Sequence, residues 1–123
     1  MTMRRRHFGK YFVTPHTRNE YRVRVSDDAN RHEYSGNEIA KIIRNVLNEI
    51  VDVDSLPRCG YSRIAEVRFR RKKMVTQPYY IAIQKDLTGG CEYVAASLWT
   101  KEIYEEIKKR QTDFRDTLAK QHE

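Results

Sequence analysis

The sequence predicts an α+β fold in which a single antiparallel sheet of about four strands carries two amphipathic helices on one face. Two segments repeat apolar residues at helical spacing, several others alternate apolar and polar residues as strands do, and the connections between successive strands are short. The predicted order is β-α-β-β-β-α, and such helices and such a sheet pack as two layers. We expect residues 1–123 to form one domain, with a basic arm at 1–9 and a frayed tail at 118–123.

The chain begins with a basic arm that contains Arg4, Arg5 and Arg6. A short extended segment is expected at residues 10–13, and Thr14-Pro15 is interpreted as a break because proline removes a backbone donor. Residues 20–26, EYRVRVS, alternate apolar and polar side chains, so a half-buried strand is predicted there. The following turn residues indicate a loop that continues to about Tyr34.

The first helix is predicted from its N-terminal signal and its apolar stripe. Ser35-Gly36-Asn37-Glu38 has the pattern of a capping box, in which Ser35 caps the first turn and Glu38 bonds back to it. Apolar residues then recur at helical spacing at Ile39, Ile42, Ile43, Val46, Leu47 and Ile50. The helix is expected to end near Val51.

Three strands are predicted to follow as an antiparallel meander, at residues 62–70, 79–85 and 91–97. In the first, Ala65, Val67 and Phe69 are assigned to the core. In the second, Tyr79 begins the core-facing set and Tyr80 the opposite set. The turn between the last two strands contains two consecutive glycines.

A long helix is predicted from about residue 98 or 100 to near Lys120. Its buried stripe is expected to contain Ile103, Ile107, Phe114 and Leu118. From Asn37 to Lys120 the α-β-β-β-α order resembles that of the double-stranded-RNA-binding domain. That family carries a Lys-Lys-x-Ala-Lys cluster at the start of its last helix, where this chain has the mixed sequence TKEIYE, residues 100–105. The resemblance is one of element order, which does not fix function.

Positive charge is concentrated in two parts of the chain, whose net charge is +7. Residues 1–34 hold 8 Lys/Arg and 4 Asp/Glu, and residues 58–86 hold 8 and 2. Clustering of this kind is typical of proteins that bind polyanions. With both helices on one face, the alternation leaves Arg22, Arg24, Arg68, Arg70 and Tyr80 on the open face of the sheet.

The predicted function is therefore non-catalytic nucleic-acid binding, with RNA preferred over DNA because unpaired bases can stack on a sheet. Arginines would hold phosphates and Tyr80 would stack on a base. The proposed contact residues are Arg4, Arg5, Arg6, Arg22, Arg24, Arg68, Arg70, Arg71, Lys72, Lys73 and Tyr80. The alternative is that arginines and tyrosines occupy the solvated side of an ordinary antiparallel sheet.

Two other functions remain open from the sequence. Small toxin-type ribonucleases resemble the chain in size and charge, and a catalytic set here would comprise His32, Glu33, Arg70 and Tyr80. Phage and mobile-element inhibitors of host proteins or nucleoprotein enzymes are also small, basic α+β proteins, and a basic patch would suit an acidic partner. The long last helix or the Tyr79-Tyr80 strand would serve a homodimer.

No cofactor or metal is expected. Cys59 and Cys91 are far apart and lack the ligand spacing of a zinc site, so both are interpreted as free thiols. The sequence also contains no apolar run long enough for a membrane span and no secretory signal. We expect a soluble, cytoplasmic protein with no membrane partner.

Overall fold

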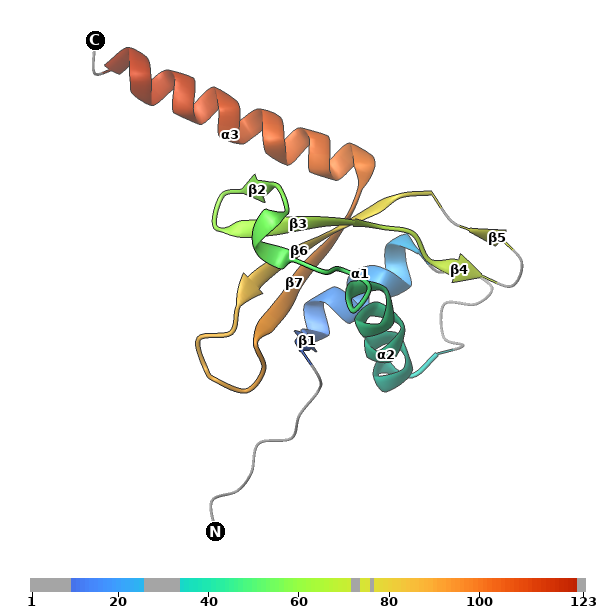
Figure 1. The fold of residues 1–123 in the computed structure, drawn as a ribbon. Helices are drawn as coiled ribbons and strands as arrows, with labels where there is room; N and C mark the ends of the chain where they lie inside the picture. Colours follow the sequence, from blue (N-terminus) through green and yellow to red (C-terminus); the bar gives the residue numbers. More distant parts are fainter. Residues whose placement is uncertain (1–9, 26–33, 72–73, 76, 122–123) are drawn as a thin grey trace.

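The fold is α+β, built around one mixed five-stranded sheet and three α-helices (Figure 1). The computed structural model describes residues 10–25, 34–71, 74–75 and 77–121. Within them the sheet order is β1-β7-β6-β3-β2, with β1 parallel to β7 and the other pairs antiparallel. The strands are β1 (Tyr11–Val13), β2 (Arg58–Cys59), β3 (Ser62–Val67), β6 (Tyr79–Lys85) and β7 (Tyr93–Thr100). The predicted sheet of about four antiparallel strands was thus too small and lacked its parallel edge.

The segment predicted as a strand at residues 20–26 belongs to a helix, α1 (Pro15–Arg24). Thr14 is its N-cap and accepts a hydrogen bond from the Thr17 N–H, while Pro15 occupies the first turn, where proline fits best. The strand prediction was wrong because Tyr21 and Val25 are four residues apart and share a helix face. Val23, which the alternation assigned to that same face, is 59% exposed.

Helix α2 (Gly36–Leu47) confirms the predicted capping box. The Ser35 hydroxyl accepts from the Glu38 N–H, and the Glu38 carboxylate accepts from the Ser35 N–H, each at 3.2 Å. The apolar stripe of α2 is buried, with Ile39 and Ile43 fully inaccessible. The helix ends at Leu47, earlier than expected, and a short 3-10 helix, η2 (Val53–Ser55), follows.

The predicted antiparallel meander is confirmed as β3-β6-β7, and the core-facing residues assigned for the first two of these strands are buried. Ala65, Val67, Phe69 and Tyr79 lie with α1 and α2 in the larger buried cluster. A bulge at Ala82/Ile83 shifts the register between β6 and β7. Both helices that cover this face lie on the same side of the sheet in Figure 1.

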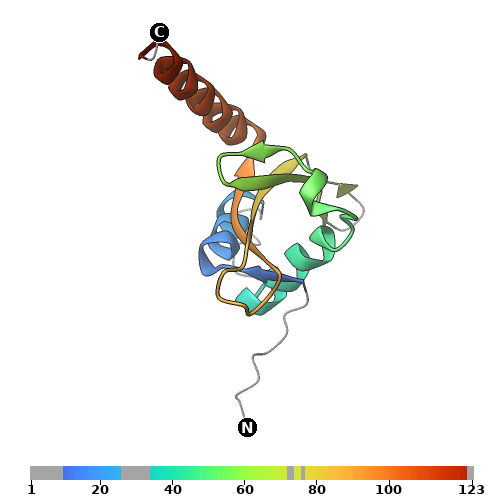
Figure 2. The ribbon, with the colours of Figure 1, turned by 60° about the vertical axis from the view of Figure 1, so that its left-hand side comes forward.

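Helix α3 (Lys101–Gln121) covers the opposite face of the sheet, so the prediction of both amphipathic helices on one face was wrong. Figures 1 and 2 show α3 on the side away from α1 and α2, with its C-terminal part projecting from the body. Tyr104 and Ile107 pack against the second buried cluster, which contains Ile64 and Tyr80. The helix continues to Gln121, beyond the point where fraying was expected.

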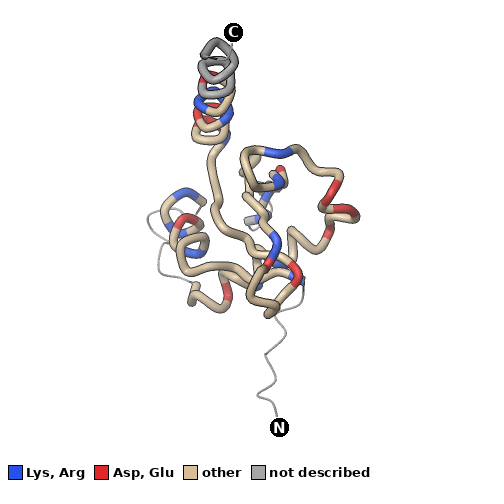
Figure 3. The backbone as a smooth tube through the Cα atoms, turned by 90° about the vertical axis from the view of Figure 1, so that its left-hand side faces the viewer, with Lys and Arg blue, Asp and Glu red and all other residues tan. Residues whose placement is uncertain are grey.

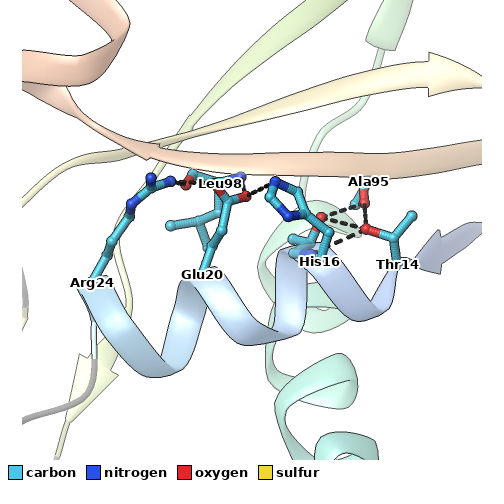
Figure 4. A network of polar contacts seen from close by, with 7 residues as sticks. Thr14, His16, Glu20, Arg24, Ala95 and Leu98 are labelled. Carbon is cyan, nitrogen blue, oxygen red and sulfur yellow. Dashed lines mark hydrogen bonds and ion pairs between the residues drawn. The ribbon is translucent and has the colours of Figure 1, made fainter.

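Helix α1 also closes the exposed edge of β7 beyond the three residues that pair with β1 (Figure 4). The Leu98 N–H donates to the Glu20 carboxylate at 2.8 Å, and the Arg24 guanidinium donates both to the Leu98 carbonyl and to Glu20. The Thr17 hydroxyl donates to the Ala95 carbonyl at 2.8 Å. Side chains of a helix thereby satisfy backbone groups that a neighbouring strand would otherwise bond.

Both cysteines are free, with Cys59 buried and Cys91 partly exposed, as the sequence predicted. Among the helices that the structure describes, none is both long and apolar enough to cross a membrane.

Candidate nucleic-acid interface

Two of the predicted contact arginines are engaged in holding α1 in place. Arg24 bonds Glu20 and the Leu98 carbonyl, and Arg22 donates to the Tyr34 carbonyl at 3.3 Å. Both were assigned to an open sheet face, and this placement was wrong because the segment is helical. They therefore do not lie beside the arginines of residues 62–70 on a common sheet face.

Tyr80, which was predicted to stack on a base from the open face of the sheet, is buried. Its side chain is only 8% exposed, and its ring stacks on that of Tyr104 at a centroid distance of 4.5 Å. Its hydroxyl donates to the Glu66 carboxylate at 3.0 Å. Burial, and then the hydrogen bond with Glu66, raise the pKa of Tyr80. A nucleic-acid base cannot stack on this ring while α3 covers it.

The predicted basic hairpin turn is instead part of a separate two-stranded ribbon. Strand β4 (Arg70–Arg71) pairs antiparallel with β5 (Met74–Val75), and the ribbon projects beyond the main sheet in Figure 1. Arg68 and Arg70 are exposed. Within the described residues, no hydrogen bond or ion pair engages the Arg70 guanidinium.

An aromatic side chain at the start of the ribbon packs into the core. Phe69, directly before β4, is fully buried. Its ring makes an edge contact with Tyr21 at 5.2 Å and a tilted contact with Tyr79 at 5.8 Å. Because aromatic contacts of this kind fix the root of the ribbon, the exposed Arg70 has a defined place relative to the body.

Several predicted site residues lie outside the described parts of the chain: Arg4, Arg5, Arg6, His32, Glu33, Lys72 and Lys73. By sequence, Lys72 and Lys73 are the two residues that join β4 to β5. Of the proposed nuclease set, His32 and Glu33 lie outside the described residues, Arg70 is exposed and Tyr80 is buried.

The sequence reasoning missed a second basic feature at the other end of β3. A partly open cleft of about 590 Å³ lies between η2, the β2–β3 hairpin and the β6–β7 turn. Its lining residues are Val53, Asp54, Arg58, Tyr61, Arg63, Ile83, Gln84, Lys85, Leu87 and Tyr93. Figure 3 looks onto this end of the molecule and shows basic and acidic positions interspersed along the backbone.

The cleft has an apolar floor and a polar rim. Val53, Ile83 and Tyr93 belong to the main buried cluster, whereas Arg58 and Lys85 are exposed. Burial, and then the charge of Asp54, raise the pKa of Tyr93, so this phenol stays neutral at physiological pH. Three cations and one carboxylate line the cleft, which gives it a net positive charge.

The turn below the rim is held by Asp86. Its carboxylate accepts hydrogen bonds from the Thr88 hydroxyl at 2.6 Å and from the Cys91 N–H at 2.7 Å. These bonds, with the Thr88 hydroxyl as the largest contribution, lower the pKa of Asp86 to about 2. The turn therefore places Lys85 and Leu87 at the cleft, and neither of their side chains makes the hydrogen bonds that hold the turn.

A sequence signal for the cleft existed in the count of basic residues at 58–86. Arg58 and Lys85 are separated in sequence by two strands and the ribbon. Both line the cleft because β3 and β6 pair with Arg63 opposite Ile83.

Comparison of the chain with protein-family models, curated proteins and solved structures gave no match. In the described part of the chain, no three His, Cys, Asp or Glu side chains are grouped to hold a metal ion.

Proposed function

We propose that the protein binds nucleic acid without catalysis, using the basic ribbon as its principal contact with the phosphate backbone. The observation that carries this proposal is the projecting β4–β5 ribbon, whose root is fixed by buried Phe69 and whose exposed Arg70 makes no side-chain hydrogen bond or ion pair with the described residues. A projecting β-ribbon is a form that fits a nucleic-acid groove, and arginine bonds phosphate through a planar fork of donors.

The chain composition around the ribbon supports the same proposal. Arg68, Arg70 and Arg71 are followed in sequence by Lys72 and Lys73, so five basic residues occur within six positions. A turn between two short strands does not require such a run. Because like charges repel in the unbound protein, their concentration favours a binding role with a polyanion over a purely structural one.

The structure changes the reason for preferring RNA. That preference depended on a base stacking on Tyr80, and this ring is covered by α3. Phosphate contacts by the ribbon do not by themselves distinguish RNA from DNA. The proposal for the ribbon is accordingly nucleic-acid binding through the backbone.

The test is a triple charge reversal, Arg70→Glu with Arg71→Glu and Lys72→Glu, with binding measured by fluorescence anisotropy on single-stranded and duplex oligonucleotides. A matched control reverses Lys41, Lys101 and Lys109, three exposed lysines that lie on α2 and α3 and not on the ribbon. Both triples change the net charge equally. We expect the ribbon triple to remove most of the affinity and the control to retain most of it.

Salt dependence gives an independent readout of the same site. The logarithm of the affinity should fall with the logarithm of salt concentration by about 0.7 per neutralised phosphate on single strands, and the ribbon triple should reduce that slope. Equal losses in both triples would contradict a local contact. Shortening of the RNA during incubation would contradict a non-catalytic role, and a pull-down that survives nuclease treatment would favour a protein partner.

A further inference from the structure

The cleft between η2 and the β6–β7 turn combines an apolar floor with a basic rim. Its floor is formed by Val53, Ile83 and Tyr93, which belong to the main buried cluster. Its rim carries Arg58 and Lys85. A volume of about 590 Å³ is within the range of small-molecule sites.

The basic groups at the rim are available to a ligand. The side chains of Arg58 and Lys85 are exposed and make no hydrogen bond or ion pair to the described residues. Arg63 donates through one terminal nitrogen to the Leu56 carbonyl at 3.0 Å, which orients its guanidinium and leaves its other donors unassigned. Two exposed cations beside an oriented arginine form a suitable site for a phosphate group.

An aromatic ring stands at the same rim. Tyr61 is 99% exposed at the tip of the β2–β3 hairpin, between Cys59 and Ser62, which pair with each other. Gly60 precedes it with a φ of 65°, a conformation that favours glycine and allows this tight turn. A tyrosine exposed in this way gains no burial in the free protein, but it offers a planar surface to a base.

We propose that the cleft binds one unpaired nucleotide, with its phosphate held by Arg58, Arg63 and Lys85 and its base stacked on Tyr61. This inference deepens the proposed function and rests on it, because the nucleotide would belong to the nucleic acid that the ribbon holds. A site of this kind would make the protein prefer single-stranded nucleic acid, since a base within a duplex is not free to stack on a protein ring.

Asp54 would make the cleft select a nucleoside monophosphate over a polyphosphate. Its carboxylate is exposed and lines the cleft together with Tyr93, whose pKa is raised first by burial and then by the charge of Asp54. A carboxylate accepts hydrogen bonds from ribose hydroxyls or base amino groups and repels a second phosphate. The cleft is therefore suited to a nucleoside monophosphate more than to a bare polyphosphate.

The test titrates the full chain with adenosine 5′-monophosphate and follows backbone amide shifts by NMR. We expect the shifts to concentrate at the cleft residues. Arg58→Gln should weaken binding about tenfold by removing a charged hydrogen bond, and Tyr61→Ala should do the same by removing the stacking surface. Tyr61→Phe, which keeps the ring, and Lys41→Gln, which removes a distant charge, should bind as the wild type does.

The comparison ligands are inorganic phosphate and a glutamate-rich peptide. Binding of either as strongly as the nucleotide, with no effect of Tyr61→Ala, would overturn the stacking assignment. An absence of shifts at the cleft would overturn the inference as a whole. Because Tyr61 and Arg58 are exposed, their variants are expected to fold normally, and the amide spectrum of each checks this directly.

The outcomes separate this inference from the proposed function. The ribbon triple should leave monophosphate binding within twofold of wild type while it removes oligonucleotide binding. If the cleft fails and ribbon-dependent oligonucleotide binding persists, only the inference is wrong. If monophosphate binds at the cleft and no oligonucleotide binds, the cleft stands as a nucleotide site and the function proposed for the ribbon is wrong.

Discussion

The two faces of the sheet are covered by clusters of different size and composition. Under α1 and α2 the described residues form a cluster of 18 buried side chains, all of them aliphatic or aromatic, to which strands β1, β3, β6 and β7 contribute. Under α3 the corresponding cluster has 5, and Tyr104 is the member that α3 itself contributes. Because buried apolar area dominates folding stability, the first face should determine whether the protein folds at all.

The second face is held mainly by stacked rings. Tyr104 stacks on Tyr80 at 4.5 Å and lies parallel to Trp99 at 6.3 Å, while the Lys108 ammonium sits 4.6 Å from its ring centroid. These contacts come from the first two turns of a helix that projects from the body (Figure 2). We therefore expect α3 to separate locally from the sheet, and α1 and α2 to unfold together with it.

The largest effect is expected at the centre of the first face. Ile43→Ala should lower the free energy of unfolding by about 2–5 kcal/mol, because Ile43 is fully buried and the lost side chain leaves a cavity. Urea denaturation followed by circular dichroism measures the change. Substitution of exposed Lys41 on the same helix serves as the control, and a loss below about 1 kcal/mol would contradict a rigid core at Ile43.

The next effect concerns the junction between α1 and β7. Glu20→Ala should destabilise the fold by about 1–3 kcal/mol, because the Leu98 N–H loses its acceptor and Arg24 loses its ion-pair partner. Glu20→Gln keeps an acceptor for Leu98 and should recover part of the loss. Equal stability of the two variants, measured by the same denaturation, would show that the backbone bond to Glu20 contributes little.

Part of this arrangement could be predicted from the sequence because local signals agreed with the tertiary structure. The Ser35–Glu38 capping box and the stripe after it specify α2, and alternation around Val67 and Ile81 correctly identifies the core faces of β3 and β6. In each case the local period and the buried face give the same answer, so no long-range information was needed.

The α1 prediction failed because two periods fitted the same few apolar residues. Tyr21 and Val25 are compatible with either a strand or one face of a helix. The deciding signals lay outside the apolar pattern, namely Thr14 as an N-cap and Pro15 in the first turn. The helix also buries the polar side chain of Thr17. A pattern of apolar residues alone cannot identify a buried threonine.

The position of α3 was missed although the strands contained a signal for it. Ile64, Tyr80 and Ala82 are apolar residues on the face that was assigned to solvent, and all three are buried. A sheet with apolar residues on both faces needs a cover on both. The cleft could not be found in this way, since Arg58 and Lys85 meet only through the pairing of β3 with β6.

A smaller global effect is expected from the second face. Tyr104→Ala should release α3 while lowering the free energy of global unfolding by less than about 1 kcal/mol, because the first cluster is untouched. Hydrogen exchange should accelerate in α3 and stay slow in β6. Trp99, the only tryptophan, should report the release by its fluorescence. Tyr104→Phe keeps the ring and should retain docking; exchange that accelerates equally in the sheet would contradict separate behaviour of the two faces.

The smallest effect, confined to high pH, tests the same separation without mutation. Burial raises the pKa of both Tyr80 and Tyr104 above the ordinary value for tyrosine, about 10, so the folded protein favours their neutral forms. This contribution is complete below pH 10, where unfolded tyrosine is also neutral, and it is lost as the pH rises through the raised values. Trp99 fluorescence should therefore show a reversible release of α3 above pH 10 before the far-ultraviolet dichroism of the sheet changes. Tyr104→Phe removes one titrating group and should move the release to higher pH, whereas simultaneous loss of both signals would mean that the two faces unfold as one unit.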